Sequence, residues 1–230
     1  MSGTNGQADG SAAAGDGLPL PGLRRFTRER QTSPALEHCE MCSEPLAPDH
    51  RHLLELNTRR ILCTCDACSL LFGYPGSGGG KYRAIPRRYL VLPDFQMTDE
   101  QWDELMIPVN MVYIFHSTPA KRVIAFYPSP AGATESSLDL QSWEVLVRNN
   151  PVLNELEPDV EALLINRVRT DREYFIVPID ACYQLVGLIR LSWKGLGGGE
   201  EVWKGIKDFF ADIRAKSRPV GGDADARPEL

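Results

Sequence analysis

Two closely spaced pairs of cysteines constrain this chain more than any other feature. Cys39 and Cys42 form the first Cys-x2-Cys pair, and Cys65 and Cys68 form the second. Each tight pair presents two thiolates on a single turn, and two such pairs complete the tetrahedron that zinc prefers. The four cysteines therefore predict a metal site, with zinc as the expected ion, that organises the chain around it.

A third cysteine, Cys63, lies close to the second pair in the stretch CTCDAC. A strand rises about 3.3 Å per residue, so Cys63 lies about 6.6 Å along the strand from Cys65. That is far for two ligands of one zinc ion, whose Zn–S bonds are about 2.3 Å long. Cys65 and Cys68 instead join a strand end to the first turn of a helix, where free amides stabilise thiolates. We therefore expect Cys63 to lie beside the metal rather than on it.

The segment between the two pairs predicts a β-hairpin with a defined register. With Asn57–Thr58 as the turn, His52 faces Cys63 and His50 faces Cys65. Directly opposed side chains share one face of a sheet, so these four residues are predicted to converge. They would form either a mixed nitrogen and sulfur site, a redox-active neighbour of the zinc, or groups that support the metal ligands. We favour the supporting role, which is common next to metal sites.

Residues 36–74 resemble a treble-clef zinc finger, since a knuckle (CEMCSEPL), a hairpin and a helix (DACSLLF) follow one another. The same residues also resemble HNH-type nucleases, through a CxxC pair, the segment DHRH and an arginine-rich strand that leads into CxxC. That resemblance implies Asp49 and His50 as a catalytic pair, with His50 as general base. However, Ser69 stands where those nucleases have Asn or His, and the net charge of −6 disfavours phosphate binding.

Beyond this module, the sequence predicts a mixed α+β domain. Residues 110–117 and 121–128 are expected to form a strand hairpin, and 172–178 another strand. Helices are expected over 138–150 and 197–216, and over 180–193 with Asp180 as N-cap. The segment 127–139 is rich in hydroxyl groups and could bind a ligand, but we favour a plain link between a strand and a helix.

The whole chain is thus divided by composition into a metal module, a domain, a linker and two tails. Residues 1–35 lack large apolar groups and cannot offset the entropy of ordering. We predict a disordered tail (1–35), the treble-clef-like module (36–74), a glycine-rich linker (75–83), the α+β domain (84–218) and a second disordered tail (219–230).

Charge and hydropathy narrow the range of functions. The acidic balance disfavours nucleic acid as a partner and favours a protein. The longest apolar runs are too short to span a bilayer, and the N-terminus lacks the features of a secretory signal. We therefore expect a cytoplasmic protein whose cysteines stay reduced and bind metal rather than pair as disulfides.

From about residue 34 to 218 the chain is similar to an uncharacterised actinobacterial family. The segments that carry this resemblance include HCEMCSEPLAPDHRHLLEL, AFYPSPAGATESSLDL and VPIDACYQLVGLIRLSWKGLGGGEEVW. Members of that family are often encoded near high-affinity uptake hydrogenases of the nickel–iron type. The resemblance implies an accessory role, with hydrogenase subunits or maturation factors as partners.

Together these features predict a non-catalytic, zinc-stabilised accessory or interaction protein. The first alternative is an electron-transfer protein that holds iron or an iron–sulfur cluster, because four thiolates bind iron as readily as zinc. The second alternative is a degenerate HNH-type nuclease.

Overall fold

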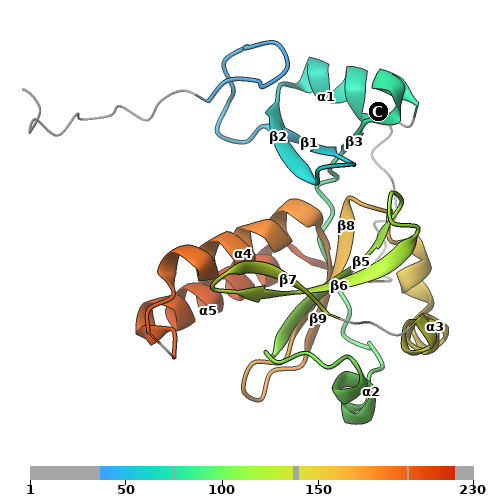
Figure 1. Ribbon diagram of the computed structural model, residues 1–230, viewed down its shortest axis with the longest axis vertical. Coiled ribbons are helices and arrows are strands. Elements are labelled where there is room, and N and C mark those ends of the chain that lie inside the picture. Colours follow the sequence, from blue (N-terminus) through green and yellow to red (C-terminus); the bar gives the residue numbers. More distant parts are fainter. Residues whose placement is uncertain (1–36, 75, 137–139, 196, 221–230) are drawn as a thin grey trace, which may run out of the picture. The chain divides into compact units, whose positions relative to one another are not determined.

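The computed structural model describes residues 37–74, 76–136, 140–195 and 197–220. The tail predicted over 1–35, and all but the first two residues of the one predicted over 219–230, lie outside these ranges. The fold is α+β, as predicted, and is built on two sheets (Figure 1). A three-stranded sheet has the order β2-β1-β3, and a seven-stranded sheet has the order β10-β4-β9-β8-β5-β6-β7.

The small sheet confirms the predicted hairpin register. Strands β1 (Arg51–Glu55) and β2 (Arg60–Thr64) are antiparallel, and His52 pairs with Cys63. Four residues connect the strands, with the Arg59 N–H donating to the Glu55 carbonyl at 2.8 Å. A four-residue loop centred on the same two residues keeps the pairing of a two-residue turn, so the same side chains share each face.

The module extends beyond residue 74, into the predicted linker. Strand β3 (Tyr82–Ala84) pairs with β1, and a short 3-10 turn, η1 (Ser77–Gly80), precedes it. Helix α1 (Asp66–Gly73) packs closely on β3, since a Cβ atom added at Gly73 would lie 2.6 Å from that of Ala84. The glycine-rich stretch therefore does not simply separate two domains, because its last residues complete the small sheet.

The large sheet contains the predicted strands and others that the sequence did not reveal. Antiparallel pairing joins all neighbours except β10 and β4, which are parallel. The strands are β4 (Leu90–Val91), β5 (Met111–Ser117), β6 (Arg122–Ser129), β7 (Gly132–Ser136), β8 (Glu161–Asn166), β9 (Glu173–Pro178) and β10 (Arg218–Pro219). Every residue of β8 is buried, so its sequence lacks the alternation that marks a half-exposed strand. Strand β7 lies within the segment predicted as a link, and β10 overlaps the start of the predicted second tail.

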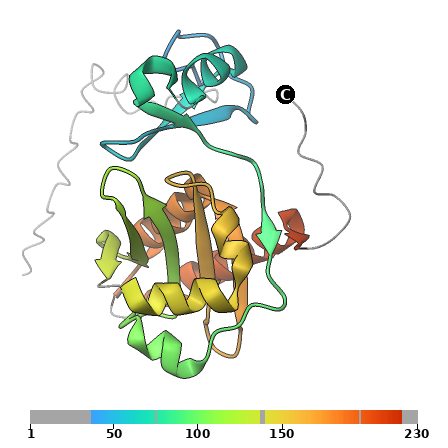
Figure 2. The same cartoon turned by 90° about the vertical axis from the view of Figure 1, so that its right-hand side faces the viewer.

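Helices cover both faces of the large sheet. Figures 1 and 2 show α4 (Ile179–Ser192) and α5 (Gly199–Lys216) on one face, and α2 (Asp99–Glu104) and α3 (Leu140–Asn149) on the other. A second 3-10 turn, η2 (Pro151–Glu155), follows α3. Two hydrophobic cores result, one on each face of the sheet. None of the helices among the described residues has the length and apolar character needed to cross a membrane.

Candidate metal centre

The first pair of cysteines lies on a tight turn before the small sheet. The Cys39 N–H donates to the Glu44 carbonyl at 2.8 Å, and the Ser43 N–H donates to the Cys39 carbonyl at 2.8 Å. Ser43 takes the left-handed backbone conformation, with φ of 66°. This turn brings the Cys42 side chain back beside that of Cys39, as the predicted knuckle requires.

The second pair joins strand β2 to helix α1. Cys65 is the N-cap of α1, and its Sγ accepts a hydrogen bond from the Cys68 N–H at 3.5 Å. The sulfur thus replaces the side-chain oxygen that usually caps a helix. Because the helix N-terminus favours negative charge, this position also stabilises a thiolate.

The four sulfur atoms of Cys39, Cys42, Cys65 and Cys68, hereafter the four-cysteine cluster, lie within 4.8 Å of one another and could hold a metal ion. Cys42 Sγ and Cys65 Sγ are 3.7 Å apart. Two thiolates on a tetrahedral zinc with bonds of about 2.3 Å are separated by about 3.8 Å. The donor set and its spacing therefore fit a tetrahedral ion with four protein ligands, and Cys63 is not among them.

The thiols of this cluster differ in their acidity. Burial raises the pKa of Cys39, but hydrogen bonds from the backbone amides of Cys65, Met41 and Cys42 outweigh it and lower that pKa to about 6. Burial and the neighbouring thiols raise the pKa of Cys68. The cluster therefore favours a thiolate at Cys39, whereas ionising all four thiols together requires a cation to offset their mutual repulsion.

Glu40 ties the knuckle to the hairpin. Its carboxylate accepts the Cys63 N–H at 2.8 Å, and its own N–H donates to the Cys63 carbonyl at 2.9 Å. The same carboxylate pairs with Arg60. Sequence reasoning missed this role, because Glu40 occupies a spacer position inside the first Cys-x2-Cys pair.

A second group of potential ligands lies on the hairpin beside the four-cysteine cluster. His50, His52 and Cys63, hereafter the histidine–cysteine group, have ligand atoms within 4.8 Å of one another. The two imidazole rings meet edge to face, with centroids 5.0 Å apart. Burial raises the pKa of Cys63, and the carboxylates of Glu37 and Glu40 raise it further. The four residues predicted to converge are thus divided, with Cys65 in the four-cysteine cluster and the other three in a group of their own.

Each histidine of this group is held through Nδ1. The His50 Nδ1 lies 2.9 Å from the Ala47 carbonyl oxygen, and 3.6 Å from the Glu37 carboxylate. The His52 Nδ1 lies 2.7 Å from the Asp180 carboxylate. In both rings, Nε2 is therefore the nitrogen available to a ligand.

The prediction that Asp180 is the N-cap of helix α4 is wrong. Pro178 holds that position, without a side-chain hydrogen bond. Asp180 lies in the first turn, where its carboxylate accepts from the Ala181 N–H at 2.8 Å and binds His52. A residue that looks like a local cap in the sequence thus connects the metal module with the α+β domain.

The geometry around Asp49 differs from that of a nuclease catalytic pair. The Asp49 carboxylate is exposed and pairs with Arg87 at 3.2 Å. The His50 Nδ1 binds the Ala47 carbonyl instead of this carboxylate. Ser69, which stands in place of the nuclease Asn or His, is buried in α1. The resemblance to HNH-type nucleases therefore does not extend to the orientation of Asp49 and His50.

Comparison with known families places most of the described region in one family. A family model described as "Family of unknown function (DUF5947)" matches residues 38–217. The chain belongs to this family. The matched span includes the four-cysteine cluster, the histidine–cysteine group and the α+β domain, so the family unites both parts of the molecule. No curated protein and no solved structure matches the chain.

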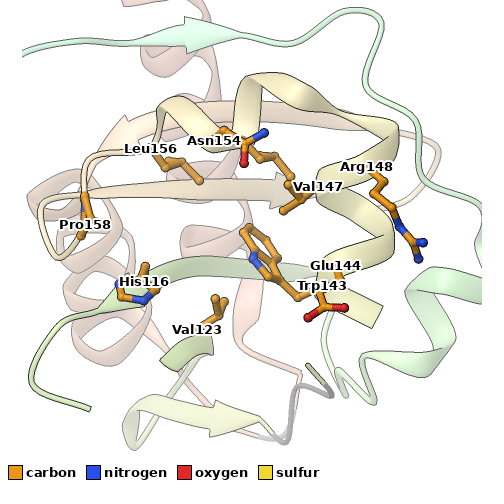
Figure 3. A pocket seen from close by; sticks show the side chains of 10 residues that line it. His116, Val123, Trp143, Glu144, Val147, Arg148, Asn154, Leu156 and Pro158 are labelled. Carbon is orange, nitrogen blue, oxygen red and sulfur yellow. The ribbon is translucent and has the colours of Figure 1, made fainter. Parts of the chain in front are cut away.

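The α+β domain also contains a hollow of about 570 Å³ beside helix α3. Figure 3 shows Trp143, Val147 and Val123 on its apolar lining, and Arg148 pointing away from them. His116 is exposed and lies at its edge. The lining also includes the polar residues Glu144 and Asn154, so the hollow is only partly apolar.

The segment predicted as a link over 127–139 forms a hairpin as far as the structure describes it. Strands β6 and β7 pair as far as Ser129 and Gly132, and the Ser129 hydroxyl donates to the Gly132 carbonyl at 2.9 Å. The Thr134 hydroxyl lies 3.1 Å from the Ser129 hydroxyl, and Glu135 pairs with Arg122. These side chains are used within the hairpin, while residues 137–139 lie outside the described part.

Proposed function

We propose that this chain is a non-catalytic, zinc-stabilised accessory protein that acts by binding a protein partner. The four-cysteine cluster is the observation that carries this proposal. Its four thiolates come from the chain itself, so a tetrahedral ion would have no open position for a substrate. Such closed sites stabilise a fold, and zinc does this without redox chemistry.

The small core around the cluster supports a structural role for the metal. Its buried members are Cys39, Leu46 and Cys68, and two of these three are candidate ligands. So few apolar side chains supply little hydrophobic stabilisation. The knuckle and the start of α1 therefore depend on metal coordination for their order.

The outer face of α1 supports binding to a protein. Leu70, Leu71 and Tyr74 are 59%, 67% and 49% exposed, although all three are large and apolar. Phe72, which lies between them in the sequence, packs on the core around the cluster and meets the ring of Tyr82. Clustered apolar side chains of this kind are typical of interaction surfaces.

The candidate partners come from the resemblance noted in the sequence. Actinobacterial proteins of similar sequence are often encoded near nickel–iron uptake hydrogenases, so we propose hydrogenase subunits or their maturation factors as partners. A cytoplasmic location would keep the cysteines reduced and available for metal.

Metal content and colour test the zinc proposal. The full chain should be purified without oxygen, analysed for metals and examined by visible absorption. We expect stoichiometric zinc and a colourless protein. Intense visible bands with stoichiometric iron would instead support the electron-transfer alternative, because the same four thiolates can bind iron.

A matched pair of variants tests the binding surface. Leu71→Glu should abolish co-purification with hydrogenase subunits or maturation factors, because it places a charge within the apolar face of α1. Leu191→Glu is the control, since Leu191 is exposed on α4 and lies outside that face. If both variants retain these partners, the proposed surface is wrong. Strong, salt-sensitive binding of DNA at physiological ionic strength would instead favour the nuclease alternative.

A further inference from the structure

The histidine–cysteine group lies on the paired part of the hairpin and just before it. His52 and Cys63 are directly paired across β1 and β2. His50 precedes His52 by two residues and therefore shares its face of the sheet. The ligand atoms of all three lie within 4.8 Å of one another. Backbone pairing thus gathers two imidazoles and a thiol at one place.

The hydrogen bonds of His50 leave one ring nitrogen available. A backbone carbonyl only accepts, so the contact from Nδ1 to Ala47 places the proton on Nδ1 of the neutral ring. Nε2 then has a lone pair. Only 9% of the side chain is exposed, and Nε2 has no hydrogen-bond partner within the described part of the chain. A buried polar atom without a partner is destabilising, so a bound ligand here would remove a penalty.

Asp180 orients the His52 ring in the same way. Its Nδ1 donates to the carboxylate at 2.7 Å, which fixes the ring and leaves the Nε2 lone pair free. In metalloproteins, a histidine ligand usually donates its other N–H to a carboxylate or a backbone carbonyl, which fixes the ring and makes the ligand more basic. His50 and His52 show one of these arrangements each.

From this geometry we infer that His50, His52 and Cys63 bind a second metal ion. Two imidazoles and one thiolate form a donor set that suits a divalent transition metal such as zinc, cobalt or nickel. Three protein ligands leave a fourth position open, whereas the four-cysteine cluster is closed. The second ion should therefore exchange more readily than the first. This site goes beyond the proposed structural role, because an open position can pass a metal or a ligand to a partner.

The net charges of the two occupied sites favour binding of both ions at once. A divalent ion held by four thiolates has a net negative charge, whereas one held by two neutral imidazoles and one thiolate has a net positive charge. Cys63 lies on β2 and Cys65 follows it by two residues, just after the strand ends, so the two ions would lie close to each other. Their opposite net charges would then attract rather than repel.

Metal stoichiometry of the full chain tests the second site. The reduced protein should be loaded with zinc, freed of excess metal and examined by native mass spectrometry. We expect two zinc ions per chain, one of which a chelator removes first. His50→Ala, His52→Ala and Cys63→Ala should each retain only the ion that resists the chelator. A single ion in the wild type, unchanged in these variants, would overturn the inference.

The chain offers matched controls for these variants. His38 and His116 are exposed histidines outside the histidine–cysteine group, and Cys182 is a buried cysteine in α4. His38→Ala, His116→Ala and Cys182→Ala should all keep both ions. Loss of the second ion from His116→Ala as well as from His52→Ala would mean that it binds elsewhere, and would contradict the inference.

Cobalt provides a spectroscopic readout of the second site in addition to metal stoichiometry. Protein with zinc in the four-cysteine cluster should bind one added Co²⁺ and develop the visible bands of a tetrahedral site. His52→Ala should lose those bands while it keeps its zinc. Partner binding is measured separately, so loss of the second site and failure of the proposed function would be distinguishable. Absence of cobalt bands in the zinc-loaded wild type would overturn the inference.

Asp180 should act as a positioning residue for this site. Asp180→Ala removes the partner of the His52 Nδ1, and we expect about 10–100-fold weaker binding of the second ion. The zinc of the four-cysteine cluster should be unchanged. Asp208→Ala is the control, because Asp208 is exposed on α5 and pairs with Lys204. Equal affinity in both variants and the wild type would show that Asp180 does not position a ligand.

Discussion

The metal module and the α+β domain are stabilised in different ways. Around the four-cysteine cluster, the buried core consists of Cys39, Leu46 and Cys68. The large sheet has an extensive hydrophobic core on each face. Strand β8 lies between these cores, with Leu164 in one and Leu163 in the other. One sequence thus combines a region with a small apolar core, which we propose is ordered by metal coordination, with a region ordered by burial of apolar surface.

The hairpin belongs to both regions. Leu54 of β1 is part of the core beneath α4 and α5, while His52 on the same strand binds Asp180. At the hairpin loop, the Arg59 guanidinium lies over the rings of Phe115 and Phe126, at 5.7 Å and 5.3 Å from their centroids. One face of the hairpin therefore rests on the domain, so loss of metal should affect the knuckle and α1 more than β1.

The largest expected effect is loss of a ligand from the four-cysteine cluster. Cys65→Ser should release the metal, because a hydroxyl is a poor replacement for a thiolate, and the N-cap of α1 would change with it. Structural zinc in small domains contributes about 10–16 kcal/mol of apparent binding free energy. Hydrogen exchange should show loss of protection in the knuckle and in α1, while β8 and β9 remain protected.

Cys63→Ser is the matched control for this variant. It should keep the metal of the four-cysteine cluster, since Cys63 lies outside that group of four sulfurs. Metal analysis of both variants after treatment with a chelator would separate the two outcomes. Retention of the resistant ion by Cys65→Ser and its loss from Cys63→Ser would show that the ligands are assigned to the wrong cysteines.

The next effect tests the α+β domain, which is ordered by burial. Phe210 of α5 is buried and stacks on Phe175 of β9, with ring centroids 6.4 Å apart. Phe210→Ala should lower the free energy of unfolding by about 3–5 kcal/mol, through lost burial and the cavity left behind. Metal content should stay unchanged. Chemical denaturation, followed together with metal release, would reveal whether the two regions are as independent as we expect.

A smaller effect is expected at an ion pair of the domain in which the carboxylate is buried and the guanidinium is partly exposed. Glu161 of β8 is almost fully buried, and its carboxylate binds Arg88 through hydrogen bonds of 2.9 Å and 2.7 Å. Arg88→Met would leave that carboxylate without its cation and should destabilise the domain by about 3 kcal/mol. Denaturation of Arg88→Met and of Arg88→Met/Glu161→Leu would check this. The double variant should recover stability, and equal loss in both would contradict the stated cause.

The sequence predicted the parts that follow local rules. The gathering of Cys39, Cys42, Cys65 and Cys68 follows from their spacing, and the pairing of His52 with Cys63 follows from the position of the turn. Both are short-range consequences of chain geometry. The exclusion of Cys63 from the four-cysteine cluster was also predicted, because about 6.6 Å of strand between Cys63 and Cys65 is far for two short thiol side chains to share one ion.

The remaining features depend on contacts between distant segments. Asp180 was predicted to be a cap because such residues favour helix starts, but it binds His52, which is 128 residues away. Strand β8 was missed because burial on both faces removes the alternating pattern that marks a strand. The first two residues of β3 were predicted as linker and its third as part of the α+β domain, since only the pairing with β1 shows that the strand belongs to the small sheet.

The smallest effect compares how the two regions start a helix. Helix α1 begins at Cys65 of the four-cysteine cluster, whereas α2 begins with a capping box. In that box, the Thr98 hydroxyl accepts the Gln101 N–H at 3.2 Å and the Gln101 side chain accepts the Thr98 N–H at 2.9 Å. Thr98→Ala removes one of these two bonds and should cost about 1 kcal/mol. Thr98→Ser is the control, because it keeps the hydroxyl and should cost much less. Denaturation should detect this difference without any change in metal content. If Thr98→Ala also released metal, the start of α2 would be coupled to the four-cysteine cluster, and the two regions would not be stabilised separately.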